Sequence, residues 1–292
     1  MSEKYPVDAE LVRRLVAEEF PQWAGLEVRP VASSGWDNFT FHLGDRMKVR
    51  LPSASGYAEQ TDKEFYWLPR LAPLLPLPVP APLAVGEPAQ DYPWRWAVYD
   101  WIDGETAMQR QPSDKKALAR GVGGFLRALQ AIDAAGGPPP GTHNFFRGGP
   151  LDVYEAEARA ALLALEGRID TATAGKILEE ALASPFAGNP VWVHGDIAPG
   201  NLLLDAEGNL KAVLDFGCCA VGDPACDLVL AWTLLEGESR TAFAETVAAD
   251  SAMWARARGW AIWKALIVLA GDNENTKPEQ WRVLEALLAE RG

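Results

Sequence analysis

The stretch His194-Gly195-Asp196-Ile197-Ala198-Pro199-Gly200-Asn201, with Asp215-Phe216-Gly217 after it, decides how this chain is interpreted. An acid at Asp196 is followed five residues later by an amide, and fourteen residues after that by a second acid. In phosphoryl transfer, one carboxylate orients the attacking hydroxyl, while an Asn oxygen and an Asp carboxylate hold the metal ions that offset phosphate charge. The order and spacing of the three residues therefore predict this chemistry.

The residues around this stretch predict a small β insert. Apolar runs indicate short strands at 191–193, 202–205 and 210–214. A turn at 207–209 joins the last two strands into a hairpin. Because a hairpin returns on itself, Asn201 at its start and Asp215 at its end should be neighbours, as two ligands of one metal cluster must be. Asp196 follows the first strand and should point into a cleft.

The pattern along the chain predicts an α+β protein in two parts. A β-rich part with one prominent internal helix should hold helices at 8–20 and 57–71 and strands at 28–32, 39–43, 47–51, 83–86 and 96–101. The part that follows should be mainly helical around the small insert, with helices at 113–134, 151–166, 172–182, 224–235, 242–270 (broken) and 277–289.

Composition excludes several kinds of protein. The 292 residues carry a net charge of −13, so nothing would neutralise a nucleic-acid backbone. No apolar run is long enough for a membrane span, and the charged first twenty residues indicate no signal peptide. We expect Cys218, Cys219 and Cys226 to be small buried side chains of a cytoplasmic protein, since their spacing does not suit zinc. The sequence gives no indication of the oligomeric state.

These motifs resemble the aminoglycoside phosphotransferase family, which shares the protein-kinase-like fold. The resemblance is sharpest over 191–228 and extends more weakly over nearly the whole chain. It implies a nucleotide-binding lobe at 1–101 and a catalytic and substrate-binding lobe at 102–292. It also implies ATP or GTP as phosphate donor, Asp196 as catalytic base, and Asn201 and Asp215 as magnesium ligands. Asp227 should be structural, hydrogen-bonding near the active-site loop.

The resemblance also places a basic residue on the third strand, against the phosphates. Lys48 and Arg50 share one face of that strand, so alternation alone cannot choose between them. The resemblance favours Arg50, because similar members of the family have a basic residue just before an apolar-Pro pair. A carboxylate on the next helix should orient it, and Glu64 fits best, with Glu59 and Asp62 as rivals.

Two further segments should contact the nucleotide. The loop before the second strand would cover the phosphates, although it lacks the G-x-G-x-x-G pattern; its candidates are Ser33, Ser34, Gly35 and Asn38. By resemblance, the end of the fifth strand is the hinge, and its backbone would hydrogen-bond the nucleobase at Tyr99, Asp100 and Ile102.

Two features argue against a protein as phosphate acceptor. Gly195 replaces the Arg that would pair with a phosphorylated activation loop, and only six residues separate Gly217 from Pro224. An activation segment able to bind a peptide does not fit there, so a small molecule is the expected acceptor.

The second lobe offers candidate acceptor contacts, namely Asp223, His143, Trp260 and Trp263. Carboxylates with aromatics would suit an aminoglycoside, while fewer exposed carboxylates would suit a macrolide or another bulky apolar acceptor. Core packing is the alternative role for the tryptophans, and a plain loop residue is the alternative for His143. A metabolic acceptor such as choline, homoserine or a sugar stays open, as does a catalytically silent nucleotide- or antibiotic-binding protein.

Overall fold

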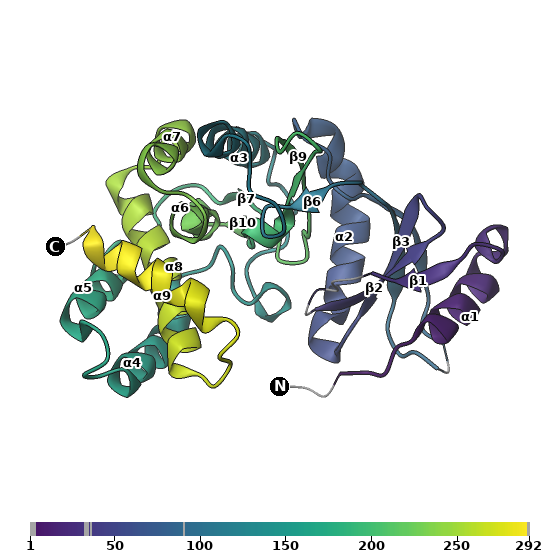
Figure 1. Ribbon diagram of the computed structural model, residues 1–292, viewed down its shortest axis with the longest axis horizontal. Coiled ribbons are helices and arrows are strands. Elements are labelled where there is room, and N and C mark those ends of the chain that lie inside the picture. The colour runs from purple at the N-terminus through teal and green to yellow at the C-terminus, as the bar shows by residue number, and fades with distance from the viewer. Residues whose placement is uncertain (1–3, 32–34, 36, 90, 291–292) are drawn as a thin grey trace.

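The computed structural model describes residues 4–31, 35, 37–89 and 91–290. Figure 1 shows a β-rich N-terminal lobe beside a larger, mainly helical C-terminal lobe, with short strands where the lobes meet. This α+β architecture confirms the predicted fold class. The lobe boundary predicted at 101/102 stays a prediction. Helix α2 (Ala58–Leu71) contacts the N-terminal sheet and also packs into the core of the C-terminal lobe.

The N-terminal lobe is built on five antiparallel strands, as the sequence predicted. In the sheet they follow the order β1-β2-β3-β5-β4, and their bounds are β1 (Val28–Pro30), β2 (Asn38–Leu43), β3 (Met47–Pro52), β4 (Pro82–Gly86) and β5 (Trp96–Asp100). β3 is central, and its Arg50 pairs with Thr40 of β2 and Ala97 of β5. A basic side chain on this strand therefore lies in the middle of the sheet.

Two helices contact the sheet. Helix α1 (Ala9–Glu19) begins at the capping side chain of Asp8 and packs an apolar face on β1 and β4. Helix α2 (Ala58–Leu71) lies on the side toward the C-terminal lobe (Figure 1). Leu68 and Leu71 at its end are buried in the C-terminal core. Earlier in α2, the buried face is polar, which is unusual for a helix facing the interior.

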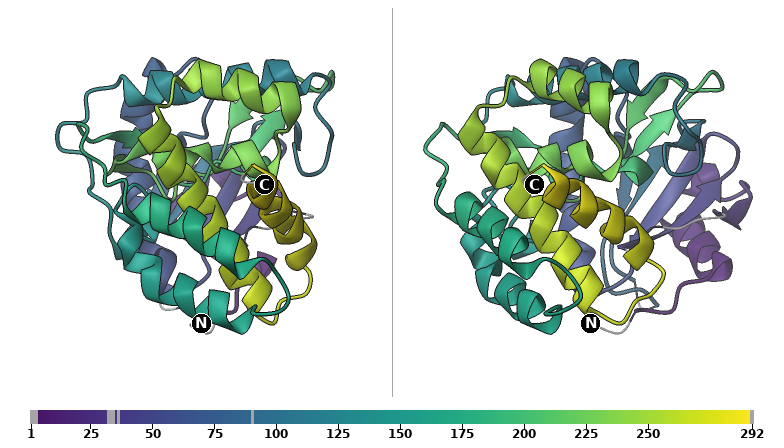
Figure 2. Two further views of the ribbon diagram at one scale, coloured as in Figure 1. Left: turned by 90° about the vertical axis from the view of Figure 1, so that its left-hand side faces the viewer. Right: turned by 60° about the vertical axis from the view of Figure 1, so that its left-hand side comes forward.

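The C-terminal lobe is a packed set of helices. Figure 2 shows α4, α5, α8 and α9 together at the end away from the sheet, and α8 contacts the other three. The helix predicted across 242–270 is broken, as expected, between α7 and α8. The helices of the lobe are α3 (Lys115–Gln130), α4 (Glu155–Ala164), α5 (Thr171–Leu182), α6 (Leu230–Thr233), α7 (Gly237–Val247), α8 (Ser251–Ala270) and α9 (Lys277–Ala289).

The small β insert has two more strands than the sequence predicted. The predicted strands are present as β7 (Val191–Val193), β8 (Leu202–Leu204) and β9 (Leu210–Val213). In addition, β6 (Glu105–Thr106) pairs with β8, and β10 (Ala220–Gly222) pairs with β7. These strands are too short for a period-2 pattern to show.

The segment predicted as one helix over 224–235 is instead a 3-10 helix, Pro224–Val229, followed by the short α6. Its start is fixed by Asp223, whose side chain accepts a hydrogen bond from the backbone of Ala225.

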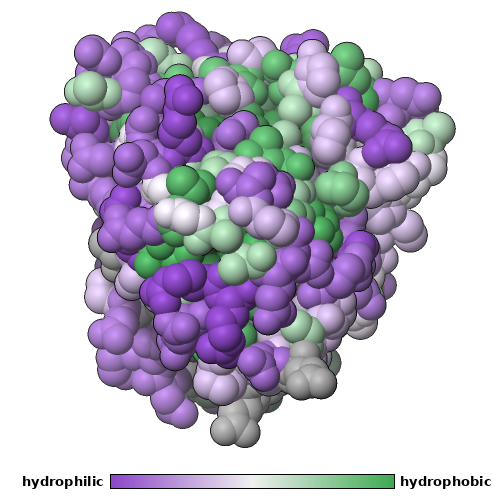
Figure 3. Space-filling model, turned by 90° about the vertical axis from the view of Figure 1, so that its right-hand side faces the viewer, coloured by the Kyte–Doolittle hydropathy of each residue, from purple (hydrophilic) through white to green (hydrophobic). Residues whose placement is uncertain are grey.

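The side of the N-terminal lobe is mostly hydrophilic, with apolar residues in a band across its middle (Figure 3). Among the described residues, no helix combines the length and apolar character needed to cross a membrane.

Candidate active site

The loop after β7 is held open by a buried acid. Asp227 accepts hydrogen bonds from the backbone N–H groups of His194 at 2.8 Å and Gly195 at 2.7 Å. Gly195 has φ of +83°, and a Cβ there would lie 2.4 Å from the carbonyl oxygen of Cys218. Only glycine suits this position. The predicted structural role of Asp227 is therefore confirmed, and the Arg found here in protein kinases has no room.

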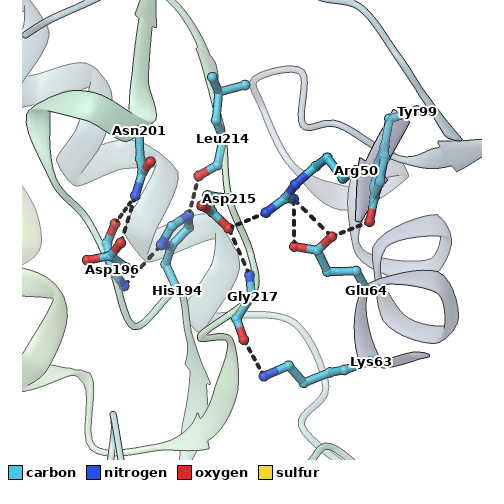
Figure 4. A network of polar contacts seen from close by, with 10 residues as sticks. All are labelled: Arg50, Lys63, Glu64, Tyr99, His194, Asp196, Asn201, Leu214, Asp215 and Gly217. Carbon is cyan, nitrogen blue, oxygen red and sulfur yellow. Dashed lines mark hydrogen bonds and ion pairs between the residues drawn. The ribbon is translucent and has the colours of Figure 1, made fainter. Parts of the chain in front are cut away.

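His194 positions Asp196 instead of exchanging a proton with a substrate. Its ring is fully buried, and Nε2 lies 2.9 Å from the carbonyl oxygen of Leu214, to which it donates. Nδ1 then accepts a hydrogen bond from the backbone N–H of Asp196 at 3.2 Å. Both ring nitrogens are used, as Figure 4 shows, so the imidazole is neutral and serves the backbone.

Asp196 and Asn201 form the exposed edge of the site. The Asn201 side-chain amide donates to the backbone oxygen and to Oδ2 of Asp196, both at 2.9 Å. This arrangement turns the Asn201 Oδ1 away from Asp196, and that oxygen makes no hydrogen bond with a described residue. An amide oxygen is the atom that a magnesium ion would require from Asn201.

Asp215 lies at the centre of Figure 4. The N–H of Leu214 donates to the carbonyl oxygen of Asn201 at 2.8 Å, so the hairpin brings Asn201 and the segment at Asp215 together as predicted. Asp215 itself has φ of +63°, a conformation that costs a non-glycine residue free energy and that gathers at functional sites. The described residues hold no cluster of three His, Cys, Asp or Glu side chains around a metal position.

The donor set nevertheless fits magnesium. This ion is commonly held by one or two carboxylates with waters and substrate phosphates, and does not need a cage of protein ligands. Asp215 and Asn201 offer one carboxylate and one amide oxygen in neighbouring backbone positions. If residue 217 carried a Cβ, that atom would lie 3.3 Å from Asp215 Oδ1, so the glycine keeps this space open. Their roles as metal ligands stay predictions that this geometry favours.

Arg50 is the basic residue in contact with Asp215. Its Nη1 lies 3.2 and 3.1 Å from the two carboxylate oxygens of Glu64, and its Nη2 lies 3.0 Å from Asp215 Oδ1. Arg50 and Glu64 are 8% and 2% exposed, which makes this a buried pair. The structure thus selects Arg50 with Glu64, as expected; the rivals Glu59 and Asp62 are exposed. Contact of Arg50 with phosphate stays a prediction.

The side chain of Tyr99 points toward Glu64. Its buried hydroxyl donates a hydrogen bond to Glu64 Oε2, and burial together with the Glu64 charge raises the pKa of this phenol well above its ordinary value. Tyr99 therefore orients Glu64, a role that the sequence did not reveal. Asp100 is exposed at the end of β5, and the backbone N–H of Ile102 makes no backbone hydrogen bond with described residues. These positions leave the hinge prediction open.

Lys48 flanks the same tyrosine from the other direction. Its Nζ lies 5.8 Å from the Tyr99 ring centre, and it has no ion pair with any described residue. Burial, followed by the neighbouring charge of Arg50, lowers the pKa of Lys48 to about 8. Strand alternation predicted that Lys48 and Arg50 share one face of β3, but only Arg50 forms ion pairs with Glu64 and Asp215.

The loop over the phosphates is described in part. Ser33 and Ser34 lie outside the described residues, Gly35 is exposed, and Asn38 is buried at the start of β2. Next to Asn38 is Asp37, a third acid of the site. Burial first, and then the charge of Asp215, raises the pKa of Asp37 to about 6.

The structure corrects the predicted acceptor role of Asp223. Its side chain is 3% exposed and accepts hydrogen bonds from Arg256 at 2.7 and 3.1 Å. The charge is therefore used inside the protein. An acceptor in the cleft would not meet this carboxylate.

The two tryptophans also belong to the core. Trp260 and Trp263 are 3% and 5% exposed, and Trp263 stacks on Tyr154 with ring centres 4.1 Å apart. The Arg147 guanidinium lies 5.0 Å from both indole rings. Packing, the alternative role for these residues, is what the structure shows, and their predicted contact with an acceptor is not supported.

His143 joins the two lobes. Its Nδ1 lies 3.1 Å from Nζ of Lys63 on α2, and its Nε2 lies 2.9 Å from the carbonyl oxygen of Pro139. A lysine ammonium only donates, so Nδ1 accepts and Nε2 carries the proton. Lys63 also donates to the carbonyl oxygen of Gly217 at 2.6 Å. The histidine thus supports the turn after Asp215 through Lys63 and, in this structure, is engaged by the protein itself.

The sequence reasoning missed several residues of the site. On α2, Gln60 and Lys63 precede Glu64 at spacings of four and one, and Gln60 and Glu64 lie one turn apart. The sequence carries no signal for them, because polar residues on a helix usually face solvent and only the structure shows that these are buried. Lys264 of α8, an exposed residue, was also missed: partial desolvation and then the charge of Arg147 lower its pKa, while the charge of Asp196 opposes the change.

The fold and the site together define a phosphotransferase with a kinase-like architecture. The family model described as "Phosphotransferase enzyme family" matches residues 27–260, so the chain belongs to this family, and the resemblance seen in the sequence is confirmed. The curated sequence of serine/threonine-protein kinase sax-1 from Caenorhabditis briggsae is 48% identical over 50 residues. That match spans 17% of this chain and a tenth of the length of the relative.

Solved structures match over nearly the whole chain. The GDP complex of aminoglycoside 2'-phosphotransferase-IIIa has a TM-score of 0.70 at 17% identity, and 98% of this chain and 100% of that chain are covered. The macrolide 2'-phosphotransferase MphH from Brachybacterium faecium has a TM-score of 0.64 at 22% identity, with 97% and 98% covered. At these identities the likeness concerns the fold, and it confirms the kinase-like architecture.

Proposed function

We propose that this protein transfers the γ-phosphoryl group of ATP or GTP to a hydroxyl group of a small molecule. The observation that carries the proposal is the meeting of two sets of residues that lie far apart in the sequence. Arg50 and Glu64 from the N-terminal lobe contact Asp215 of the C-terminal lobe, whose neighbouring strand end holds Asn201 and Asp196. Few structural needs would bring this set together on an accessible edge.

Each residue has a definite part in the proposed reaction. Asp196 accepts a hydrogen bond from the acceptor hydroxyl and takes its proton as the new O–P bond forms. The bond between the γ-phosphorus and the β–γ bridging oxygen breaks, and the nucleoside diphosphate leaves. Arg50 would contact the α- and β-phosphates through its planar fork. Asn201 and Asp215 would hold magnesium, which supplies positive charge against the phosphates.

The donor would bind between the hinge and the loop over the phosphates. Asp100 and Ile102 would present backbone groups to the base, and Gly35 and Asn38 would lie over the phosphates with the neighbouring serines. Solved relatives of this fold include a GDP complex and a streptomycin–ATP ternary complex. Both purine nucleotides are therefore donors to be tested.

The acceptor is proposed to be bulky and to carry few positive charges. Three carboxylates of the second lobe that could attract a polycation are paired: Asp223 with Arg256, Glu236 with Lys115, and Glu238 with Lys116. Near Asp196, Lys264 and Arg147 add positive charge. This balance favours a macrolide or another largely apolar alcohol over an aminoglycoside, which carries several ammonium groups. A cytoplasmic location is part of the proposal, since the three described cysteines are free thiols.

The test is an acceptor screen with the purified chain, magnesium, and ATP or GTP, in which nucleoside diphosphate release is measured. We expect release that depends on one class of acceptor and on magnesium, with a phosphorylated product found by mass spectrometry. Absence of acceptor-dependent release across aminoglycosides, macrolides, choline, homoserine and sugars would contradict the proposal.

A silent binding protein of the same fold is the second candidate. The ion pair between Arg50 and Asp215 favours it, because a predicted metal ligand is already engaged by a cation. Under this alternative, nucleotide binds with magnesium but no product forms with any acceptor. The exposed Asp196, held ready by Asn201, favours the enzyme.

A further inference from the structure

Helix α2 presents a group of buried polar side chains toward the turn after Asp215. Two of them have partners: Glu64 binds Arg50, and Lys63 donates to the carbonyl oxygen of Gly217. The third, Gln60, is 3% exposed; its amide interacts with the carboxyl of Asp37, and its carbonyl oxygen makes no hydrogen bond with a residue that the structure describes.

A buried amide oxygen without a partner needs an explanation. Buried polar side chains in folded proteins nearly always have a hydrogen-bond partner, because an unsatisfied donor or acceptor retains the full desolvation penalty. Residues that break such a local rule are expected at functional sites.

The surroundings of the amide identify the kind of ligand. The space beside the Cα of Gly217 is flanked by two oxygens: a Cβ placed there would lie 2.8 Å from Gln60 Oε1 and 3.3 Å from Asp215 Oδ1. Asp37 is another neighbour, and the Gln60 amide opposes the rise in the pKa of that carboxyl. Two carboxylates and an amide oxygen form an environment for a cation and its waters.

We propose that Gln60 is a further binding residue for the magnesium–nucleotide complex. Its side-chain carbonyl oxygen accepts a hydrogen bond from a water of the hydrated magnesium ion beside Asp215. This inference rests on the proposed function, which supplies the magnesium and the nucleotide. The glycine at 217 leaves the room that such a water needs.

The experiment measures the Kd of a non-hydrolysable ATP analogue by calorimetry, with magnesium and with EDTA, together with the Tm of the free protein. Gln60→Met should weaken binding about tenfold with magnesium, the value of one hydrogen bond, and leave binding in EDTA unchanged. The Tm without ligand should stay the same or rise, because the substitution removes an unsatisfied amide oxygen. Gln280→Met on α9 is the matched control, since Gln280 is similarly buried and lies in the C-terminal lobe.

Gln60→Glu keeps an acceptor oxygen and tests the direction of the hydrogen bond. It should retain magnesium-dependent binding, whereas a direct bond from the Gln60 N–H to phosphate would be lost and replaced by repulsion. The proposal is overturned if Gln60→Met binds like the wild type, if it loses affinity equally with and without magnesium, or if Gln60→Glu weakens the magnesium complex as much as Gln60→Met does. If the wild-type chain binds no magnesium–nucleotide, the proposed function fails first and this inference with it.

Discussion

Arg50 and Asp215 form an ion pair of 3.0 Å that links the two lobes. The same guanidinium binds Glu64, so one side chain joins β3, α2 and the end of the β8–β9 hairpin. In this form of the protein Arg50 neutralises Asp215. In the proposed reaction, the phosphates would be a second partner for the arginine and magnesium a second partner for the acid. The ion pair is thus a ligand-free arrangement of groups that the proposed reaction uses.

Removing the guanidinium should strongly destabilise the protein. Arg50→Met leaves Glu64 buried without its partner, and breaking such a pair from one side costs about 3–5 kcal/mol. The free energy of unfolding in urea measures this effect. Arg95→Met is the control: Arg95 is an exposed arginine that also pairs with two acids, and its loss should cost about 1 kcal/mol or less. Equal losses in the two variants would contradict the structural account of Arg50.

Asp196→Asn should abolish most turnover while leaving the donor site intact. The substitution keeps the shape of the side chain but removes its ability to take a proton, so we expect kcat to fall by about 10² to 10⁴. The Kd for magnesium–nucleotide should change little, because Asp196 is assigned to the acceptor. Asp45→Asn, in the turn between β2 and β3, is the control and should have no effect on kcat. Turnover near the wild-type level would show that Asp196 is not the base.

Lys48 should make stability depend on pH above neutrality. Its pKa is about 8 in the folded protein and near its ordinary value of 10.5 in the unfolded chain. The unfolded chain therefore binds more protons between these values, and stability rises with pH across that window. Relative to Lys48→Met, the wild type should gain about 2 kcal/mol between pH 7 and pH 10. Parallel pH profiles of unfolding for the two proteins would contradict this prediction.

Asp223 and Arg256 should act on folding and not on the acceptor. Arg256→Met leaves a buried carboxylate unpaired, so the protein should lose about 3–5 kcal/mol of stability. The double variant with Asp223→Asn should recover part of this loss, which a double-mutant cycle measures. The KM for the acceptor in the fraction that remains folded should be unchanged. A large rise in KM with little loss of stability would return Asp223 to the acceptor site.

The sequence predicted the parts of the site that depend on local order. Asp196, Asn201 and Asp215 lie within one β insert, where the chain itself fixes their spacing. The choice between Lys48 and Arg50 was different, since strand alternation gave both the same face. It depended on Asp215, which is 165 residues from Arg50 along the chain. No pattern within a window of the sequence could report that contact.

The acceptor residues were predicted wrongly for a related reason. The sequence does not show whether an acidic or aromatic side chain faces a ligand or another residue of the protein. Asp223 faces Arg256, Trp263 faces Tyr154, and His143 faces Lys63, each from a different element. Contacts with residues distant in the sequence decided these cases, and such contacts depend on how the elements of both lobes pack.

By itself, the sequence determined the order of the elements, the α+β class and the three residues expected for phosphoryl transfer, because local spacing and periodicity follow from backbone geometry. Only the tertiary structure decided that Arg50 meets Asp215, that Tyr99 orients Glu64, and that the Gln60 carbonyl oxygen is buried without a partner. These are contacts between elements distant in the chain. Their energies come from burial and charge pairing, which exist only when the lobes are packed together.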